Sequence, residues 1–158
     1  MTHDLKSIYY GIKTRCYNKN NKGYPNYGAR GIKMCSEWEN SFEAFCKDVG
    51  ERPESMTLDR IDGGGHYCPE NCRWADNSVQ IYNKKKLNKS TYIKRVKDKE
   101  YEVISVRFKF KDFKIVRDFR MRDMDKVDSF IEKCDNYIKE QIIPNYTEPL
   151  ACNKITKI

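Results

Sequence analysis

The chain has 158 residues, enough for one or two small domains that each bury a modest core. Its 31 Lys and Arg against 23 Asp and Glu give a formal net charge of +8, which favours a polyanionic partner without distinguishing DNA from RNA. No segment approaches the roughly 18 apolar residues of a membrane helix. The seven cysteines, an odd number without an N-terminal apolar export segment, argue against a secreted disulfide scaffold. We therefore expect a cytoplasmic protein with no membrane segment.

The first half of the chain alternates between helical spacing and polar loops. Apolar residues over 5–16 recur at intervals of three and four, which predicts a helix. A Gly- and Asn-rich loop follows at 18–31, then a strand-like segment at 32–35 and a second helix over 42–49, which Gly50 ends. Beyond it, the pattern predicts a β-hairpin with a Gly-rich loop and then a helix that starts near residue 77.

The second half of the chain is basic and changes to strand spacing. Residues 84–122 hold 15 Lys or Arg against five Asp or Glu. Apolar and polar side chains alternate over 104–110, and 91–96 and 113–119 look like partner strands. Helical spacing returns over 127–138, so we expect a three-stranded sheet covered by one helix. We predict domains at 1–89 and 90–146 and, because residues 147–158 carry no clear pattern, a tail there.

The segment LDRIDGGGHYCPENCRWADNSVQIYNKKK, residues 58–86, resembles the HNH (ββα-metal) nucleases, especially phage and homing-type members. Upstream, YGARGI at 27–32 and VGERPESMTLDRID at 49–62 resemble phage HNH proteins, so the likeness extends over about residues 5–88. It implies an α+β fold with an HNH ββα-metal nuclease module. It also implies a homing-endonuclease-like hydrolase of bacteriophage or mobile-element type that cuts phosphodiester bonds in double-stranded DNA.

The resemblance also implies a metal site. Asp59 and Asn83 would supply oxygen ligands to a hard divalent cation, Mg²⁺ or Mn²⁺, which stabilises the leaving oxygen. Asn71 matches the central Asn of the family, which braces the loop or orients the catalytic base. Two blander interpretations stay open: Asp59 could form a structural ion pair with Arg60, and Asn83 could be a surface amide.

Arg60 stands where most HNH enzymes have the His that deprotonates water. Arginine stays protonated in proteins, so Arg60 is expected to stabilise negative charge on the phosphate. A different residue must then act as the base. The candidates are His66, Tyr67 and Tyr27, with Asp62 less favoured, although Tyr67 could be a packing residue and His66 exposed and idle.

The cysteines give little indication of a zinc site. Cys68 and Cys72 are four residues apart, Cys16 and Cys35 lie singly, and no paired C-x-x-C spacing occurs. This spacing disfavours a structural Zn²⁺ and favours cysteines that pack as small apolar residues.

The predicted sheet and helix of the second domain resemble in pattern the AP2-like DNA-binding domain that often follows HNH units. The resemblance implies that an exposed basic sheet face enters the major groove, where the same residues could otherwise form an ordinary solvated face. The expected DNA contacts over the whole chain are Tyr27, Arg30, Arg73, Lys84, Lys85, Lys86, Arg95, Arg107, Lys109 and Lys111. In YGARGI, the two glycines could either admit a phosphate or shape a turn.

Two other functions remain compatible with the sequence. A non-catalytic DNA-binding protein or regulator could use an HNH-like scaffold. Such a role would explain why the usual His is missing. RNA binding through the sheet is less favoured, because the aromatic residues alternate onto the side assigned to the core and leave no exposed aromatic pair.

Overall fold

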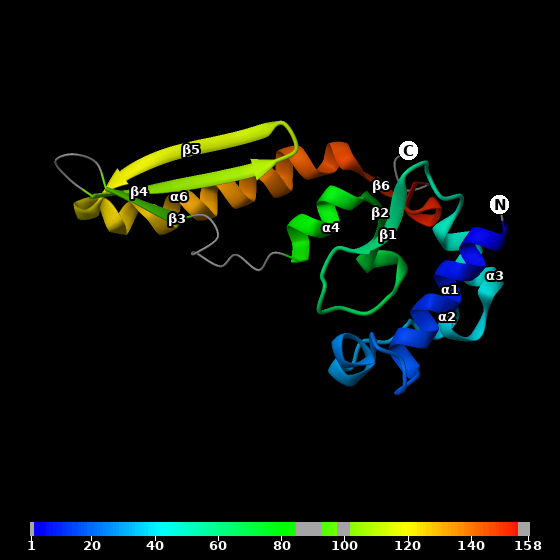
Figure 1. Ribbon diagram of the computed structural model, residues 1–158. Coiled ribbons are helices and arrows are strands. Elements are labelled where there is room, and N and C mark those ends of the chain that lie inside the picture. The colour runs from blue at the N-terminus through cyan, green and yellow to red at the C-terminus, as the bar shows by residue number, and fades with distance from the viewer. Residues whose placement is uncertain (1, 85–92, 98–101, 155–158) are drawn as a thin grey trace. The chain divides into compact units, whose positions relative to one another are not determined.

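The structure, a computed structural model, describes residues 2–84, 93–97 and 102–154 (Figure 1). Its helices and small sheets confirm the α+β class. The described chain forms two compact units: residues up to Asn77 together with those from Thr147 form the first, and Ser78–Tyr146 the second. In the part of the chain that is described, no helix is both long and apolar enough to cross a membrane.

The first unit begins with α1 (Thr2–Tyr17), whose predicted apolar face is buried. Two 3₁₀ turns, Tyr24–Asn26 and Gly28–Arg30, form the loop that follows. Gly28 approaches α1 so closely that a Cβ atom there would lie 2.1 Å from the Cys16 carbonyl oxygen, and Gly31 has a φ of 80°. Of the two roles considered for these glycines, shaping the path of the chain is the one that the geometry supports.

The helices α2 (Ser36–Asn40) and α3 (Phe42–Val49) come next. The bounds predicted for α3 are confirmed: the Ser41 hydroxyl accepts the Ala44 N–H at 3.0 Å, and Gly50 follows the helix with a φ of 71°. The strand predicted at 32–35 was wrong. Only an isolated bridge between Met34 and Tyr67 forms there, because the segment is too short to extend into a ladder.

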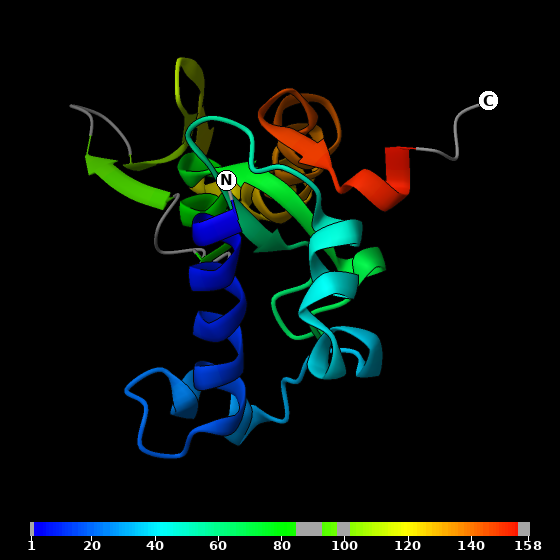
Figure 2. The same cartoon turned by 90° about the vertical axis from the view of Figure 1, so that its right-hand side faces the viewer.

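The predicted hairpin is present as the antiparallel pair of β1 (Met56–Arg60) and β2 (Cys72–Asp76). The helix α4 (Asn77–Lys84) follows β2 directly, as expected. A third strand, β6 (Thr147–Pro149), pairs with the other edge of β2, so the sheet order is β1-β2-β6. Figure 2 shows β6 leading into the C-terminal 3₁₀ turn (Ala151–Lys154) beside α3.

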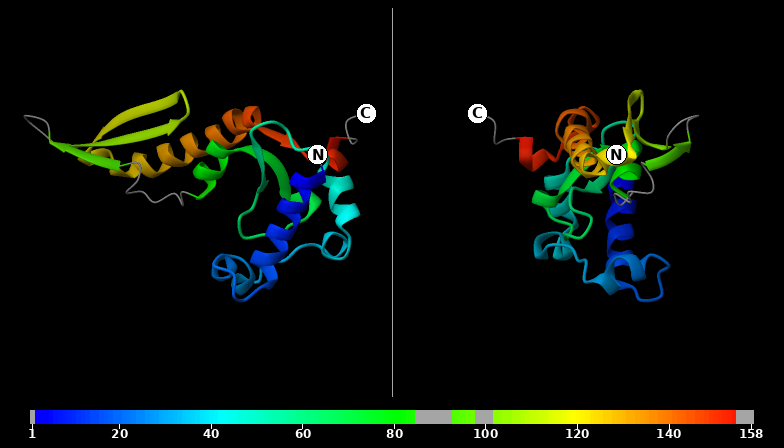
Figure 3. Two further views of the ribbon diagram at one scale, coloured as in Figure 1. Left: turned by 45° about the vertical axis from the view of Figure 1, so that its right-hand side comes forward. Right: turned by 90° about the vertical axis from the view of Figure 1, so that its left-hand side faces the viewer.

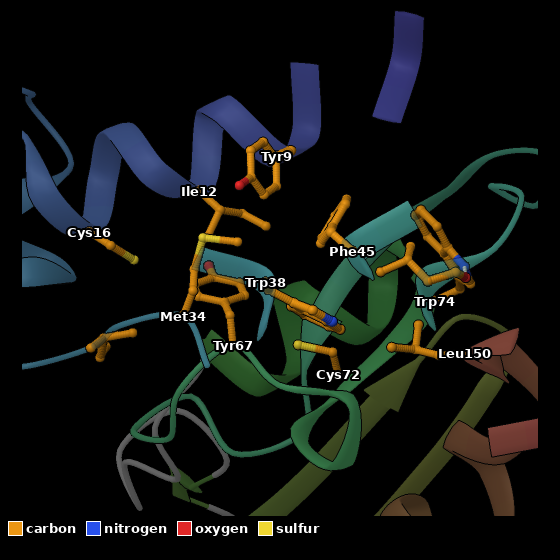
Figure 4. Packing of buried hydrophobic residues seen from close by; sticks show 12 residues of the cluster. Tyr9, Ile12, Cys16, Met34, Trp38, Phe45, Tyr67, Cys72, Trp74 and Leu150 are labelled. Atoms are coloured by element: carbon orange, nitrogen blue, oxygen red, sulfur yellow. Dashed lines mark hydrogen bonds between the residues drawn. The ribbon is translucent and has the colours of Figure 1, made fainter. Parts of the chain in front are cut away.

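This returning strand corrects the predicted domain organisation. Residues 147–154 are not a tail, because Leu150 is fully buried in the core of the first unit together with Trp74 (Figure 4). A three-residue strand and one apolar side chain are too short to show a periodicity in the sequence. The boundary predicted after residue 89 also differs from the structure, which divides the chain between Asn77 and Ser78.

The second unit contains the predicted three-stranded antiparallel sheet, in the order β3 (Ile93–Lys97), β4 (Glu102–Phe110) and β5 (Phe113–Arg120). The helix α6 (Met124–Tyr137) runs along one side of β4 and β5 (Figures 1 and 3). The apolar positions of β4 are buried under it, as the alternation predicted, and Phe119 of β5 contacts Phe130 of α6 with ring centroids 5.3 Å apart.

The burial of Leu150 predicts a stability effect from a residue outside both predicted domains. Leu150→Ala should lower the free energy of unfolding of the first unit by about 2–5 kcal/mol, because it leaves a cavity in the core. Ile61→Ala, which shortens a side chain that is 52% exposed, is the matched control and should cost less than about 0.5 kcal/mol. Urea unfolding followed by tryptophan fluorescence measures both. Equal effects would mean that 147–154 does not belong to the core.

Candidate functional site

Asp59 and Arg60, the two residues at the end of β1, face opposite sides of the hairpin because strand residues alternate. Asp59 lies opposite Arg73 in the register, and Arg60 lies opposite the buried Cys72. Asp59 is 9% exposed, and its Oδ2 accepts the Nε–H of Arg73 at 3.4 Å. The ion pair considered for Asp59 therefore forms with its cross-strand neighbour and not with Arg60.

Arg73 is a predicted DNA contact, and the structure gives this side chain a partner within the hairpin. Its side chain is 19% exposed, and it pairs with Asp59 across β1 and β2. The sequence could not show this, because the pairing register places these two residues opposite each other. The DNA contact of Arg73 stays a prediction.

On the other side of the hairpin, Arg60 lies against two tyrosine rings. Its guanidinium carbon is 5.1 Å from the ring centroid of Tyr27 and 4.8 Å from that of Tyr67, and its NH1 group donates to the Gly65 carbonyl at 2.6 Å. The two rings are nearly parallel, with centroids 6.4 Å apart. The loop at residue 27 therefore meets the β1–β2 hairpin here, at residues 60 and 67.

A fourth residue of this cluster, Arg15, was not predicted from the sequence. Its guanidinium carbon lies 5.1 Å from the Tyr27 centroid and 5.2 Å from the Tyr67 centroid. One signal could have revealed it: Arg15 is three residues after Ile12 and seven after Ile8, so a charged side chain occupies the apolar face of α1.

Asn71 braces the Gly-rich loop between β1 and β2. Its Oδ1 accepts the Asp62 N–H at 2.8 Å, and its Nδ2 donates to the carbonyls of Asp62 at 3.1 Å and His66 at 2.9 Å. Its backbone carbonyl also accepts the Ile61 N–H at 2.8 Å. These contacts correspond to the first of the two roles that the sequence suggested for Asn71, support of the loop next to Arg60.

The candidate bases differ in their exposure. Tyr67 is 3% exposed, and burial raises the pKa of its phenol to about 12 despite the opposing effect of Arg15 and Arg60, so it stays protonated at neutral pH. His66 is exposed, and its Nδ1 accepts the Lys33 N–H at 3.4 Å. Tyr27, half-buried, is the remaining aromatic candidate.

The two predicted metal ligands belong to different units, Asp59 to the first and Asn83 to the second. Asn83 is exposed near the end of α4. Among the residues that the structure describes, no three His, Cys, Asp or Glu side chains gather in a way that could hold a metal. Joint ligation by Asp59 and Asn83 therefore remains a prediction from the resemblance.

The cysteines are free thiols, and Cys16 and Cys72 are buried in the core of the first unit, as packing residues should be. Burial raises the pKa of the Cys72 thiol to about 12 and also raises the pKa values of Cys35 and Cys68. Burial thus favours the protonated form of these three neighbouring thiols.

In the second unit, Arg107 and Lys109 are exposed on the side of the sheet away from the buried positions of β4, as predicted. The β4–β5 register adds Lys114, opposite Lys109, and Arg120 to this side. We call these four residues, Arg107, Lys109, Lys114 and Arg120, the basic face. Lys114 and Arg120 were missed because the side of a strand that a residue occupies depends on the register of its partner.

The other two predicted sheet contacts are Arg95 and Lys111. Position 95 pairs with Ile104 in the register, and the side chain of Arg95 lies outside the described residues. Lys111 is in the β4–β5 turn, and its Nζ lies 4.0 Å above the Tyr146 ring.

The remaining predicted DNA contacts lie in the first unit or near the gap after α4. Arg30 is exposed in the loop beside Tyr27, and its NH1 group donates to the Asn26 carbonyl at 3.5 Å. Lys84 ends α4, but its side chain, together with Lys85 and Lys86, lies outside the described residues.

Comparisons with family models, with curated proteins and with solved structures found no match to this chain.

The buried phenol of Tyr67 predicts a loss of stability at high pH. The folded pKa, about 12, is above the ordinary value of 10.0, so the stabilisation is complete below pH 10 and is lost as the pH rises through 12. In Tyr67→Phe, the free energy of unfolding should fall by roughly 2–3 kcal/mol less over this pH range, as expected for about two pKa units. Urea unfolding at several pH values between 8 and 12 measures it. Tyr10→Phe, at a position that is 59% exposed, is the control, and an identical alkaline profile for all three proteins would contradict the assignment.

Proposed function

We propose that this protein is a metal-dependent endonuclease of the HNH type that hydrolyses phosphodiester bonds in duplex DNA. The observation that supports it best is the β1–β2 hairpin, in which Asp59 and Arg60 end the first strand and Asn71 braces the loop beside them. The helix α4 follows the hairpin directly, which is the element order that the resemblance requires.

Asp59 is the proposed protein ligand of the metal in the first unit, and Asn83 is its proposed partner from α4. A carboxylate and an amide oxygen suit Mg²⁺ or Mn²⁺, which bind through few protein oxygens and keep several waters. A bound ion of this kind supplies Lewis-acid stabilisation of the phosphate oxygens. Arg73 holds this carboxylate in place across the hairpin, since its Nε–H donates to Asp59 Oδ2 at 3.4 Å.

Arg60 is proposed to stabilise the negative charge that develops on the phosphate. The Gly65 carbonyl and the two rings restrict the orientation of its guanidinium group, so little reorganisation is needed when charge appears. Tyr27 is the proposed base, because its ring lies against Arg60 and it is less enclosed than Tyr67.

The second unit is proposed to hold the DNA. Within it the charges are separated: the basic face lies on β4 and β5, whereas α6 carries four acidic residues against two lysines. A merely solvated sheet face usually interleaves both signs, and here Asp118 is the one acidic residue of β5. A positive sheet with an acidic helix behind it favours one orientation on a polyanion.

A non-catalytic DNA-binding protein is the second candidate, and one observation favours it. The Asp59 carboxylate already has an ionic partner in Arg73, so the side chain has a structural role that needs no metal. This candidate shares the DNA-binding second unit and differs only in the absence of turnover.

Cleavage of supercoiled plasmid in Mg²⁺ or Mn²⁺ distinguishes the two candidates. We expect the protein to nick or linearise the plasmid, EDTA to stop the reaction, and Asp59→Asn to lower the rate at least about a hundredfold while DNA binding persists. Arg73→Met is the matched control, because it also breaks the ion pair but keeps the proposed ligand, and it should retain most of the activity. An inactive unmodified protein, or equal loss in both variants, would favour the non-catalytic candidate.

Reversal of charge tests the basic face independently of catalysis. Arg107→Glu with Lys109→Glu should weaken binding to a duplex at least about tenfold and lower the salt dependence of binding, since two phosphate contacts are lost. The same reversal at Lys126 and Lys133, exposed on α6, changes the net charge equally and should have a much smaller effect. Equal losses in a fluorescence-anisotropy titration would mean that the sheet is not the DNA-binding surface.

A further inference from the structure

Arg15 has an unusual environment in the last turn of α1. Its Nε is enclosed, and among the described residues it is the one buried side-chain nitrogen or oxygen without a hydrogen-bond partner. Within the described part of the chain, the guanidinium group of Arg15 contacts the faces of Tyr27 and Tyr67 and forms no hydrogen bond or ion pair. An enclosed donor without an acceptor is costly and needs an explanation, and a bound anion is one.

The charge around Arg15 points in the same direction. Arg60 lies against the same two rings, and its guanidinium donates to a neutral carbonyl, that of Gly65. Both guanidinium carbons are 5.1 Å from the Tyr27 centroid, so they can be no more than twice that distance apart. No ion pair joins either arginine to a carboxylate in the described residues. Two positive groups therefore lie against the same ring pair, and neither has a carboxylate partner among the described residues.

We propose that Arg15 is a second phosphate-binding residue, which acts with Arg60 to hold one backbone phosphate beside the Tyr27–Tyr67 ring pair. The proposal rests on the function proposed above and adds a residue from α1 to it. Guanidinium groups bind phosphate oxygens through two parallel N–H donors, and stacking on the rings fixes the planes of both forks in advance. A phosphodiester carries one negative charge and acquires a second when hydroxide adds to phosphorus, so two guanidinium groups match the charge of that transition state better than Arg60 alone.

The competing interpretation is that Arg15 only ties α1 to the two tyrosine-bearing loops by cation–π contacts. Binding of a minimal phosphodiester separates the two. The probe is a dinucleotide of two thymidines joined by one phosphate, and thymidine, which lacks the phosphate, is the control. In the full chain labelled with ¹⁵N-arginine, the enclosed Nε–H of Arg15 should exchange slowly enough to be observed. It is assigned by its absence from Arg15→Met.

We expect the dinucleotide to shift the Nε–H signals of both Arg15 and Arg60 along a saturable curve, and thymidine to leave them in place. Signals of Arg15 that do not move while those of Arg60 do would overturn the proposal. Arg122→Met, at an arginine of the second unit whose side chain is 75% exposed, should leave the curve unchanged. Shifts that thymidine produces equally would mean that the rings bind the base, which also contradicts a phosphate site.

A second measurement separates this proposal from the proposed function. Arg15→Lys keeps the charge but loses the planar fork, and it should slow plasmid cleavage at least about tenfold while the melting temperature and duplex binding stay near those of the unmodified protein. If the protein cleaves no DNA but the dinucleotide still shifts Arg15, the nuclease proposal fails and the phosphate site stands. If cleavage is normal in Arg15→Lys and no shift occurs, the phosphate site fails and the nuclease proposal stands.

Discussion

Consecutive residues of a β-strand face opposite sides of the sheet, and this constraint divides the candidate site into two halves. Asp59 turns to the side where Arg73 neutralises it, and Arg60 turns to the side where two tyrosines and Arg15 lie. The carboxylate is therefore paired, while the two arginines share aromatic faces and form no ion pair with a carboxylate of the described residues. The two sides differ in electrostatic character: the first favours a cation next to a fixed carboxylate, and the second favours an anion.

The positive half depends on a loop that cannot hold its shape by secondary structure alone. Residues 61–71 include three consecutive glycines, and the Asn71 amide replaces the missing backbone ladder with contacts to Asp62 and His66. The same loop supplies the Gly65 carbonyl that fixes Arg60 and the Tyr67 ring that stacks on Tyr27. Asn71 thus acts on the arginines through the loop, without touching either of them.

The second unit is organised around a different buried polar contact. Tyr82 of α4 donates a short hydrogen bond to the carboxylate of Asp135, which is 3% exposed on α6 and also pairs with Lys139 at 2.6 Å. This contact and the packing of the Tyr82 ring on Phe110, with centroids 5.7 Å apart, assign most of α4 to the second unit. It explains why a boundary based on composition was placed too late: the basic run after α4 marks a change in charge, whereas the division of the chain follows the contacts of Tyr82.

The sequence by itself determined the elements whose signals are local. Apolar spacing predicted α1, α3 and α6, alternation predicted β4 and its partners, and the order of residues from Asp59 to Asn83 predicted a hairpin followed by a helix. A capping Ser41 and a terminal Gly50 even defined the ends of α3. Each of these depends on neighbours within one or two turns, so the physical cause is visible in the sequence.

Only the tertiary structure decided which side chains meet. Asp59 pairs with Arg73 because of the strand register, and Lys114 joins the basic face for the same reason. Arg15 reaches the Tyr27–Tyr67 pair because α1 packs beside two distant loops, and Leu150 completes a core that begins at Tyr9. These contacts join segments separated by tens of residues. Burial then changes the pKa values of these groups, and it raises the pKa of Tyr67. No local pattern in the sequence shows how deeply a side chain will be buried.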